Sequence, residues 1–242
     1  MWNLQNVEPV RSIIGLFYPQ LCASCNALIE WPEYLCEGCR RKAPRIKPPF
    51  CARCSEPFPG AITEVFSCAN CANRVLHFDA AVAAYRSRGV VRQVIHQFKY
   101  GHEIHLRFPV ADWLAETLVD PRLAGRSFDV MIPVPLHPAR KRERGFNQAE
   151  LLAELFSATA RIPMRPWLER LRYTTTQTAF DRTERMENLR DAFRLRKKAN
   201  VRGLRVLLID DVLTTGSTVS ECARVLKTGG ALSVHAATAA RA

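Results

Sequence analysis

One stretch near the carboxyl end, residues 206–218, most constrains what this chain can fold into. It reads Val-Leu-Leu-Ile-Asp-Asp-Val-Leu-Thr-Thr-Gly-Ser-Thr. Four uninterrupted apolar residues are typical of a strand that is buried on both faces of a parallel sheet. Asp210 and Asp211 follow where such a strand would emerge at its carboxyl end, which is where open α/β sheets bind ligands. A helical pattern then runs to a pair of glycines at 229–230, which indicate its end.

The residues between this strand and this helix suit a sugar phosphate. Backbone amides of a short loop and of a helix N-terminus favour a phosphate, and Thr and Ser hydroxyls add donors. Asp210 and Asp211 would repel a phosphate, but their carboxylates can accept hydrogen bonds from ribose hydroxyls. A Walker B strand would need a partner loop containing Gly-Lys, and no Gly-Lys pair occurs in the chain. A solvated acidic turn is the alternative, but it leaves the run of hydroxyl residues unexplained.

The charge of the chain is strongly positive and unevenly distributed. The 242 residues carry a formal net charge of +12, and residues 78–242 hold 27 Lys/Arg against 17 Asp/Glu. This surplus favours anionic partners, either phosphorylated small molecules or nucleic acid. No apolar run approaches the roughly 20 residues of a transmembrane helix, and Glu8 and Arg11 argue against a signal peptide in the partly apolar residues 10–19. We therefore expect a cytoplasmic protein with no membrane-inserted segment.

Eight of the nine cysteines form four Cys-x-x-Cys pairs near the amino terminus. The pairs are Cys22 with Cys25, Cys36 with Cys39, Cys51 with Cys54, and Cys68 with Cys71. Disulfides are not expected in a cytoplasmic protein, whereas two such pairs can complete a tetrahedral four-cysteine zinc site. A segment this short rarely holds together by its core alone, so two zinc ions would supply its folding free energy.

Two ways of pairing the cysteines remain open. Sequential sites would use the first two pairs for one zinc ion and the last two for the other, whereas a cross-brace would interleave them. Short gaps favour two consecutive zinc ribbons, because each then closes one small loop. Four thiolates leave no open coordination position, which indicates structural zinc. The alternative, a redox-active Cys-x-x-Cys, usually involves one motif beside a βαβ pattern.

From residue 78 the composition changes and regular elements are expected. The patterns predict strands over residues 80–85, 129–135 and 232–240, and helices over 90–98, 106–119 and 149–160. We therefore predict a zinc-ribbon domain over residues 1–77 and an α/β domain over residues 78–242. His102 and His105, which could suggest a metal pair, are expected to be solvated loop residues.

A cluster of cations follows the second of these strands. Arg140, Lys141, Arg142 and Arg144 lie between the prolines that end the strand and Asn147, which is a residue type that favours helix starts. A strand end, a constrained loop and cations before a helix together predict a second anion site. A solvated basic turn is the alternative.

The pattern at residues 206–218 resembles the phosphoribosyl-pyrophosphate (PRPP) loop of type I phosphoribosyltransferases. The resemblance implies that Asp210 and Asp211 hold the ribose, act in catalysis and work with Mg²⁺, which accompanies PRPP. It implies that the phosphate is held by Thr214, Thr215, Gly216, Ser217 and Thr218, and that the diphosphate lies on a loop with Pro135, Leu136, His137 and Arg140. It also implies a mobile lid over residues 173–190, for which a disordered linker is the alternative.

The chain as a whole is similar to the ComF family of competence-associated proteins. The shared features are residues 16–19 before Cys22, the cysteine pairs, Phe-Lys-Tyr at 98–100, Pro-Val-Pro at 133–135, Arg-Gly-Phe-Asn-Gln at 144–148, Gln177 and Thr178 with Arg185 and Asn188, and the final loop. Phe180 stands where many relatives have leucine. The resemblance implies a double zinc ribbon before a type I phosphoribosyltransferase-like parallel sheet.

Two functions follow from this resemblance. One is an enzyme that transfers phosphoribose from PRPP to an unknown nitrogen nucleophile, in a protein associated with DNA uptake and with partners in the competence machinery. The other is a protein that handles single-stranded DNA and keeps the PRPP pocket for binding or regulation. A basic surface of this kind binds phosphates without reading sequence, and no residues for stacking bases are evident from the sequence.

Overall fold

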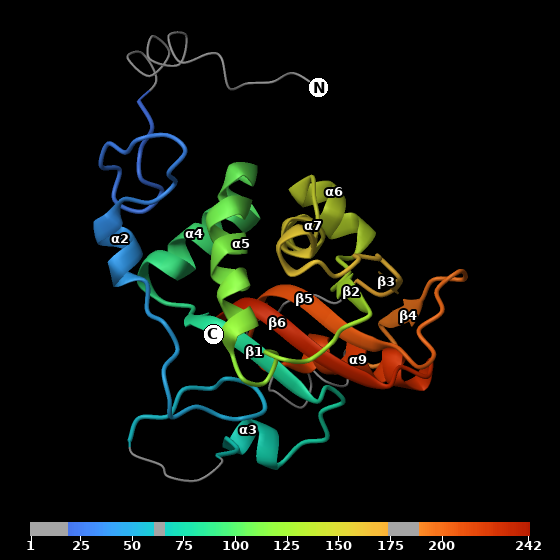
Figure 1. Ribbon diagram of the computed structural model, residues 1–242. Coiled ribbons are helices and arrows are strands. Elements are labelled where there is room, and N and C mark those ends of the chain that lie inside the picture. The colour runs from blue at the N-terminus through green and yellow to red at the C-terminus, as the bar shows by residue number, and fades with distance from the viewer. Residues whose placement is uncertain (1–18, 61–65, 174–188) are drawn as a thin grey trace.

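A computed structural model describes residues 19–60, 66–173 and 189–242 of the chain (Figure 1). The helical elements are α2 (Glu37–Lys42), α3 (Ala69–Ala72), α4 (Gly89–Tyr100), η2 (Ile104–Leu106), α5 (Arg107–Ala115), η3 (Glu116–Val119), α6 (Pro138–Arg144), α7 (Gln148–Ala160) and α9 (Ser217–Thr228). The strands are β1 (Ala80–Arg86), β2 (Val130–Pro133), β3 (Leu168–Arg170), β4 (Phe193–Leu195), β5 (Arg205–Leu213) and β6 (Ser233–Arg241).

The centre of the molecule is a parallel sheet. Among the described residues its strand order is β1-β6-β5-β2. Its register pairs Ala80 with His235, Val206 with Val234, and Val130 with Val206. The apolar run of β5 is buried as predicted, and its side chains alternate between the two faces: Leu207 and Ile209 join one core, and Val206 and Leu208 join the other. The fold is therefore a parallel sheet with helices on both faces, as expected.

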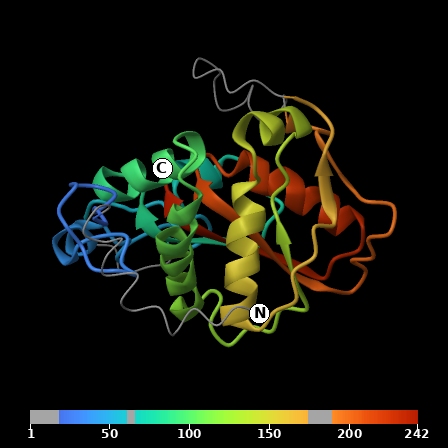
Figure 2. The same ribbon diagram turned by 90° about the horizontal axis from the view of Figure 1, so that it is seen from above.

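Each face of the sheet has its own cover. Helices α4, α5 and α7 pack over the face that carries Leu207 and Ile209, and α5 and α7 lie side by side across it (Figure 2). Helix α9 covers the opposite face, against Val206 and Leu208. Helix α4 buries its apolar stripe, Val90, Val91, Val94, Ile95 and Phe98, which confirms the predicted helical spacing.

The two cysteine-rich segments lie on opposite faces of this sheet (Figure 1). We call residues 22–39 the first ribbon and residues 51–74 the second ribbon. Cys22 and Cys39 of the first ribbon belong to the core under α4 and α5, whereas all four cysteines of the second ribbon belong to the core beside α9. The expected domain boundary after residue 77 falls just before β1 and stays a prediction.

Within the described residues, the structure differs from the predicted elements at several places. The cations at residues 140–144, expected on a loop, lie on helix α6, which begins after His137 as its N-cap. Strand β5 runs on to Leu213, because β6 pairs with it beyond the apolar run. The predicted helix over 106–119 is an α-helix with 3-10 turns at both ends. A small antiparallel pair, β3 with β4, was not expected. The motif residues 16–18, Gln177, Thr178, Phe180, Arg185 and Asn188, and most of the predicted lid, lie outside the described residues.

The described helices also bear on membrane association. None of those that the structure describes combines the length and the apolar character needed to cross a bilayer.

Candidate functional site

The candidate site lies where β5 and β2 end side by side. The pairing of β2 with β5 ends at Pro133 and Ile209, and Val134 N then donates to Ile209 O at 2.9 Å. Beyond this point β5 continues along β6, while the chain after β2 turns into the loop at residues 134–137. The acidic pair therefore lies within β5, next to the start of the predicted diphosphate loop. The carboxyl edge of the sheet brings the two predicted anion sites together.

The two aspartates have different surroundings. Asp211 is 4% exposed, and its Oδ1 lies 2.8 Å from Nζ of Lys99 at the end of α4. Asp210 is half-buried, and its Oδ1 accepts from Asp211 N at 2.9 Å. Burial, and then the negative charge of Asp211, raise the pKa of Asp210 to about 7. The pair therefore holds one firmly paired carboxylate and one carboxyl that ionises near neutral pH.

The loop after β5 is shaped by Gly216. Its φ is +76°, a left-handed conformation that favours glycine, and it forms the N-cap of α9 with its carbonyl accepting from Ser220 N at 2.8 Å. The Thr215 and Ser217 hydroxyls lie 2.9 Å apart across it. The result is a tight turn of small hydroxyl residues at the N-terminus of a twelve-residue helix, which is a suitable geometry for an anion.

The second ribbon contacts this loop directly. Asn70 Nδ2 donates to Thr215 O at 3.2 Å, and Arg74 Nη1 donates to the same oxygen at 3.2 Å. Arg74 Nη2 also donates to Ser217 Oγ at 2.8 Å, and Arg74 Nη1 donates to Asn70 Oδ1 at 2.6 Å. A residue pair from the zinc-binding segment thus holds one side of the candidate phosphate loop.

The predicted diphosphate loop leads into α6. Pro135 is buried, and His137 forms the N-cap of α6 by accepting from Ala139 N at 3.2 Å. Arg140 lies on α6, close enough to Arg170 of β3 to lower the pKa of that guanidinium, after burial, which is the larger cause. Asp210 acts on Arg170 in the opposite sense. Arg170 of β3 therefore lies close enough to Asp210 for their charges to interact, and Arg140 of α6 lies near Arg170.

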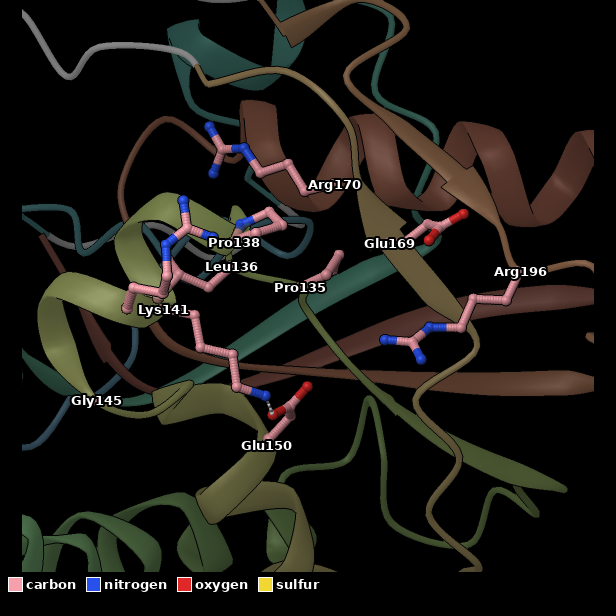
Figure 3. Close-up of a pocket in the computed structure, with 10 residues that line it drawn as sticks. Pro135, Leu136, Pro138, Lys141, Gly145, Glu150, Glu169, Arg170 and Arg196 are labelled. Atoms are coloured by element: carbon pink, nitrogen blue, oxygen red, sulfur yellow. Dashed lines mark hydrogen bonds and ion pairs between the residues drawn. The ribbon is translucent and has the colours of Figure 1, made fainter.

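A cavity of about 610 Å³ opens beside this loop (Figure 3). It is lined by Pro135, Leu136, Pro138, Lys141, Arg142, Gly145, Glu150, Glu169, Arg170 and Arg196. Lys141 Nζ donates to Glu150 Oε2 at 2.6 Å, which ties α6 to α7 at its edge. Since four of the lining residues are cations and two are carboxylates, the cavity favours an anionic group.

A smaller cavity of about 260 Å³ lies beside exposed aromatic rings. The Arg144 guanidinium sits 4.9 Å from the centre of the Tyr100 ring, and that of Arg140 sits 5.6 Å from the centre of the Tyr173 ring. Both tyrosines are exposed, and Lys99 lines the same cavity. Stacking residues were not evident from the sequence, and two arginine–tyrosine pairs lie at this cavity. Lys99, the partner of Asp211, connects the cavity to the acidic pair.

The cysteines form two sequential groups. Cys22, Cys25, Cys36 and Cys39 lie together, as do Cys51, Cys54, Cys68 and Cys71, with the sulfurs of each group within 4.8 Å of one another. Four convergent sulfurs fit the tetrahedral geometry of zinc, so both groups are suited to a structural zinc ion. Of the two arrangements left open, the structure has the sequential one. His102 and His105 are exposed, as predicted.

Three residues near the site were not singled out from the sequence as site residues. They are Lys99, which pairs with Asp211, Arg170, whose charge interacts with that of Asp210, and Arg74, which holds the loop. Lys99 stood in a recognised motif, but nothing local indicated its partner. Arg74 lies 143 residues before Ser217, so only the fold brings the two together.

Comparison with known proteins gives the same architecture. A model described as "Double zinc ribbon domain" matches residues 13–75, and one described as "Phosphoribosyl transferase domain" matches residues 122–242. The chain is 32% identical over 234 residues to the DNA utilization protein YhgH of Salmonella typhimurium, which covers 91% of this chain and 96% of that protein.

Two further relatives carry competence names. Competence protein F of Haemophilus influenzae is 29% identical over 218 residues, covering 87% of this chain and 92% of that protein. Competence protein ComFC of Bacillus subtilis is 28% identical over 223 residues, covering 88% and 87%. With both domain models and these full-length similarities, the chain belongs to the ComF family of competence and DNA utilization proteins.

Proposed function

We propose that residues 210–218 bind PRPP or a related phosphoribosyl ligand, and that the protein transfers phosphoribose to a nitrogen nucleophile. The observation that carries this proposal is the shared edge of β5 and β2. It puts a carboxylate pair, a helix N-terminus with its hydroxyl loop and a cationic loop next to one another. Ribose hydroxyls, a phosphate and a diphosphate need these three kinds of partner in this proximity.

Each part has a separate task in the proposed reaction. Asp211, fixed by Lys99, and Asp210 accept hydrogen bonds from the ribose hydroxyls, and the residues from Thr214 to Thr218 hold the 5′-phosphate. The loop of Pro135, Leu136 and His137, with Arg140, holds the diphosphate. The bond from C1 of the ribose to diphosphate breaks while a bond from C1 to nitrogen forms, and the nitrogen then loses its proton. Positive charge on the sugar is stabilised by the acidic pair.

The carboxyl pair also fits a magnesium ion. Oxygen ligands suit Mg²⁺, which is commonly held by one or two carboxylates together with substrate phosphates, and two carboxyl groups adjoin the cationic loop here. Mg²⁺ bound with PRPP would screen the charge of the diphosphate. Asp210 and Asp211 are the residues that would face it. We further propose that the protein works in the cytoplasm.

Binding calorimetry tests this proposal. Wild-type protein should bind Mg-PRPP and ribose 5-phosphate. Asp210→Asn combined with Asp211→Asn should weaken binding through the ribose, and Thr215→Ala through the phosphate, each by about tenfold or more. Equal binding by wild type and both variants contradicts the assignment. Release of diphosphate from Mg-PRPP, measured against a panel of bases and amines, identifies the nucleophile.

A second candidate function is the handling of single-stranded DNA. The observation that favours it is the pair of arginine–tyrosine stacks beside the acidic pair, because exposed rings next to cations suit unpaired bases and their phosphates. The relatives named for competence and DNA utilization agree with such a role. Binding of a labelled oligonucleotide should weaken as the salt concentration rises. Partners in a competence machinery would bind the same single-stranded DNA.

Competition separates the two candidates. If the cationic loop serves both ligands, PRPP should displace the oligonucleotide, and replacing Arg140 and Lys141 by alanine should weaken both. Tyr100→Ala should weaken the oligonucleotide alone, by roughly fivefold or more. If the protein does not bind DNA, or if saturating PRPP leaves DNA binding unchanged, the pocket serves catalysis only.

A further inference from the structure

The second ribbon does more in this structure than hold itself together. Its helix α3 (Ala69–Ala72) carries Asn70 between two of the cysteines, Cys68 and Cys71, and Arg74 follows three residues after Cys71. Both side chains reach the loop after β5, where they donate to Thr215 O and Ser217 Oγ. A third contact joins His77 N to Ser220 Oγ at 3.1 Å. The chain leaving the second ribbon thus runs along the start of α9.

These contacts determine how the loop presents its backbone. In a trans peptide the carbonyl and the following N–H lie in one plane and point in opposite directions. Two donors hold the Thr215 carbonyl toward the second ribbon, so the N–H of Gly216 is directed away from the ribbon. Arg74 also holds Ser217 Oγ, which lies 2.9 Å from Thr215 Oγ1. The ribbon therefore fixes both a backbone donor and the hydroxyls of the loop.

Packing reinforces the same connection. Phe78 is 1% exposed, and an added Cβ at Gly216 would lie 3.5 Å from its ring. The four cysteines of the second ribbon share a core with Phe78, Leu213 and Val219, which flank the loop in sequence or in space. The four cysteines, the Phe78 ring and the loop form one closely packed unit, so a displacement of one of them shifts the others.

The first ribbon provides a natural contrast. Ser24 Oγ donates to Gln93 Oε1 at 3.0 Å, and Gln93 Nε2 donates to Ser24 O at 3.1 Å. Gln93 lies on α4, on the opposite face of the sheet from α9. The described contacts of the first ribbon are therefore with helices, and those of the second include the phosphate loop itself.

We infer that the zinc ion of the second ribbon and the phosphate of the sugar ligand are energetically coupled through Asn70 and Arg74, whereas the zinc ion of the first ribbon is not. This inference rests on the proposed binding of a sugar phosphate by residues 214–218. Arg74 and Asn70 are positioning residues, because they act on the ligand through the loop. Coupling is reciprocal: metal at the second ribbon strengthens ligand binding, and the ligand raises the affinity of that ribbon for metal by the same factor. Tighter metal binding is expected to slow metal loss from that ribbon.

The first experiment measures the affinity of the full-length, zinc-loaded protein for ribose 5-phosphate. Arg74→Ala should weaken binding about tenfold or more, since it removes charge-assisted bonds to the loop, and Asn70→Ala by a few fold. Arg74→Lys should recover part of the loss. Gln93→Ala, the matched control in the contact of the first ribbon, should bind like wild type. Zinc content measured on each variant shows that the ribbons are intact.

The second experiment measures zinc release to a chelator with and without ribose 5-phosphate. Cys22→Ser leaves the second group intact, and its remaining zinc should be released more slowly, by severalfold, when the ligand is present. Cys54→Ser leaves the first group intact. At a ribose 5-phosphate concentration that saturates this variant in calorimetry, its zinc should be released at a rate that the ligand does not change. In Arg74→Ala the protection should disappear although the zinc content is normal. This last readout separates coupling from a merely structural role.

The outcomes distinguish this inference from the proposed function. If wild-type protein does not bind ribose 5-phosphate or PRPP, the proposed function fails, and the inference fails with it. If wild type binds, but Arg74→Ala and Asn70→Ala bind equally well, the inference alone is overturned. Equal protection of both zinc ions, or of neither, in a protein that binds the ligand also overturns it.

Discussion

The two ribbons have the same ligand pattern but different places in the molecule. In the first ribbon Cys25 is exposed and Cys36 is half-buried, whereas all four cysteines of the second ribbon are buried. The first ribbon lies against α4 and α5, where Tyr34 stacks on Phe108 with ring centres 5.6 Å apart. The second ribbon lies against β1 and the loop after β5. Cysteine spacing therefore determines where a metal ion can bind, whereas the place at which each ribbon packs on the sheet domain determines which other residues that metal site holds in position.

Among the described residues, the second ribbon also makes more hydrogen bonds to the sheet domain that involve backbone atoms than the first ribbon does. Ala81 N of β1 donates to Arg53 O at 2.8 Å, and Ala83 N donates to Ser55 Oγ at 3.0 Å. Arg122 reaches across to donate to Cys51 O at 3.3 Å and to Ser55 Oγ at 2.9 Å. Strand β1 therefore has β6 on one side and the second ribbon on the other. Loss of this ribbon would expose an edge of the main sheet.

The largest expected difference between the ribbons is in global stability. Cys22→Ser and Cys54→Ser are matched, because the two cysteine residues are 0% and 2% exposed. Each should lower the zinc content, measured by elemental analysis. Cys54→Ser should lower the melting temperature by on the order of 10 °C, because loss of its zinc ion disrupts the core beside α9. Cys22→Ser should lower the melting temperature by a few degrees.

Limited proteolysis sharpens this result. Cleavage of Cys22→Ser should be confined to the amino-terminal region, while Cys54→Ser should also become susceptible within the sheet domain. Equal melting temperatures and equal cleavage patterns would show that the ribbons are equivalent. Disulfides in place of zinc in the wild-type protein would end the interpretation of both groups.

A smaller difference is expected from the side chains that attach each ribbon. Arg122→Ala removes several bonds from a side chain that is 16% exposed and also pairs with Asp120 at 2.7 Å. It should lower the free energy of unfolding in urea by about 2–4 kcal/mol. Gln93→Ala should cost less than about 1 kcal/mol, since its contacts to the first ribbon are exposed. Arg126→Ala is a matched arginine control, and a loss there as large as at Arg122 would contradict the special role of the attachment.

The smallest expected effect is a pH dependence of ligand affinity that distinguishes the two halves of the site. The second ribbon contacts the loop proposed to hold the phosphate, whereas the pKa of Asp210, proposed to hold the ribose, is raised to about 7, chiefly by burial. Between about pH 4 and pH 7 the folded protein therefore binds more protons than the unfolded chain, and this contribution to stability is lost as pH rises. A cation bound with the ligand favours the carboxylate, so affinity for Mg-PRPP should rise severalfold from about pH 6 to about pH 8.

Asp210→Asn is the control for this pH dependence. Its affinity should vary only with the titration of the ligand itself, and Arg74→Ala should keep the full wild-type dependence because it alters the other half. Calorimetry in buffers of different ionisation enthalpy should show proton release on binding by wild type. The same pH profile in wild type and Asp210→Asn would place the titrating group elsewhere.

Local patterns in the sequence were sufficient for the ribbons and for most of the sheet. Cys-x-x-Cys spacing predicted the two four-cysteine groups, and the apolar run at residues 206–209 predicted the buried part of β5. Both signals act between near neighbours in the chain. The strand continues to Leu213 because β6 pairs with it, and a partner strand cannot be read from the segment it extends. Strands β3 and β4 have three residues each, which is too short for a periodic pattern.

The candidate site was only half predictable for the same reason. Its acidic pair and hydroxyl loop are consecutive in sequence, so their chemistry could be recognised together. Lys99 and Arg74 approach that segment from distant positions, and nothing in their own surroundings distinguishes them from other surface cations. The stacking of Arg144 on Tyr100 likewise needs the fold to bring α6 beside α4. Spatial assembly, which no local pattern encodes, supplied these partners.

The position of β6 has a consequence for synthesis on the ribosome. Strand β6 (Ser233–Arg241) lies between β1 and β5 in the sheet although it is the final strand in the sequence. Strand β1 (Ala80–Arg86) therefore leaves the ribosome roughly 150 residues before its neighbour exists, a wait on the order of ten seconds at translation rates of about 5–20 residues per second. The ribbons can take up metal during that wait, and the second ribbon would then shield one side of β1 until the last strand arrives.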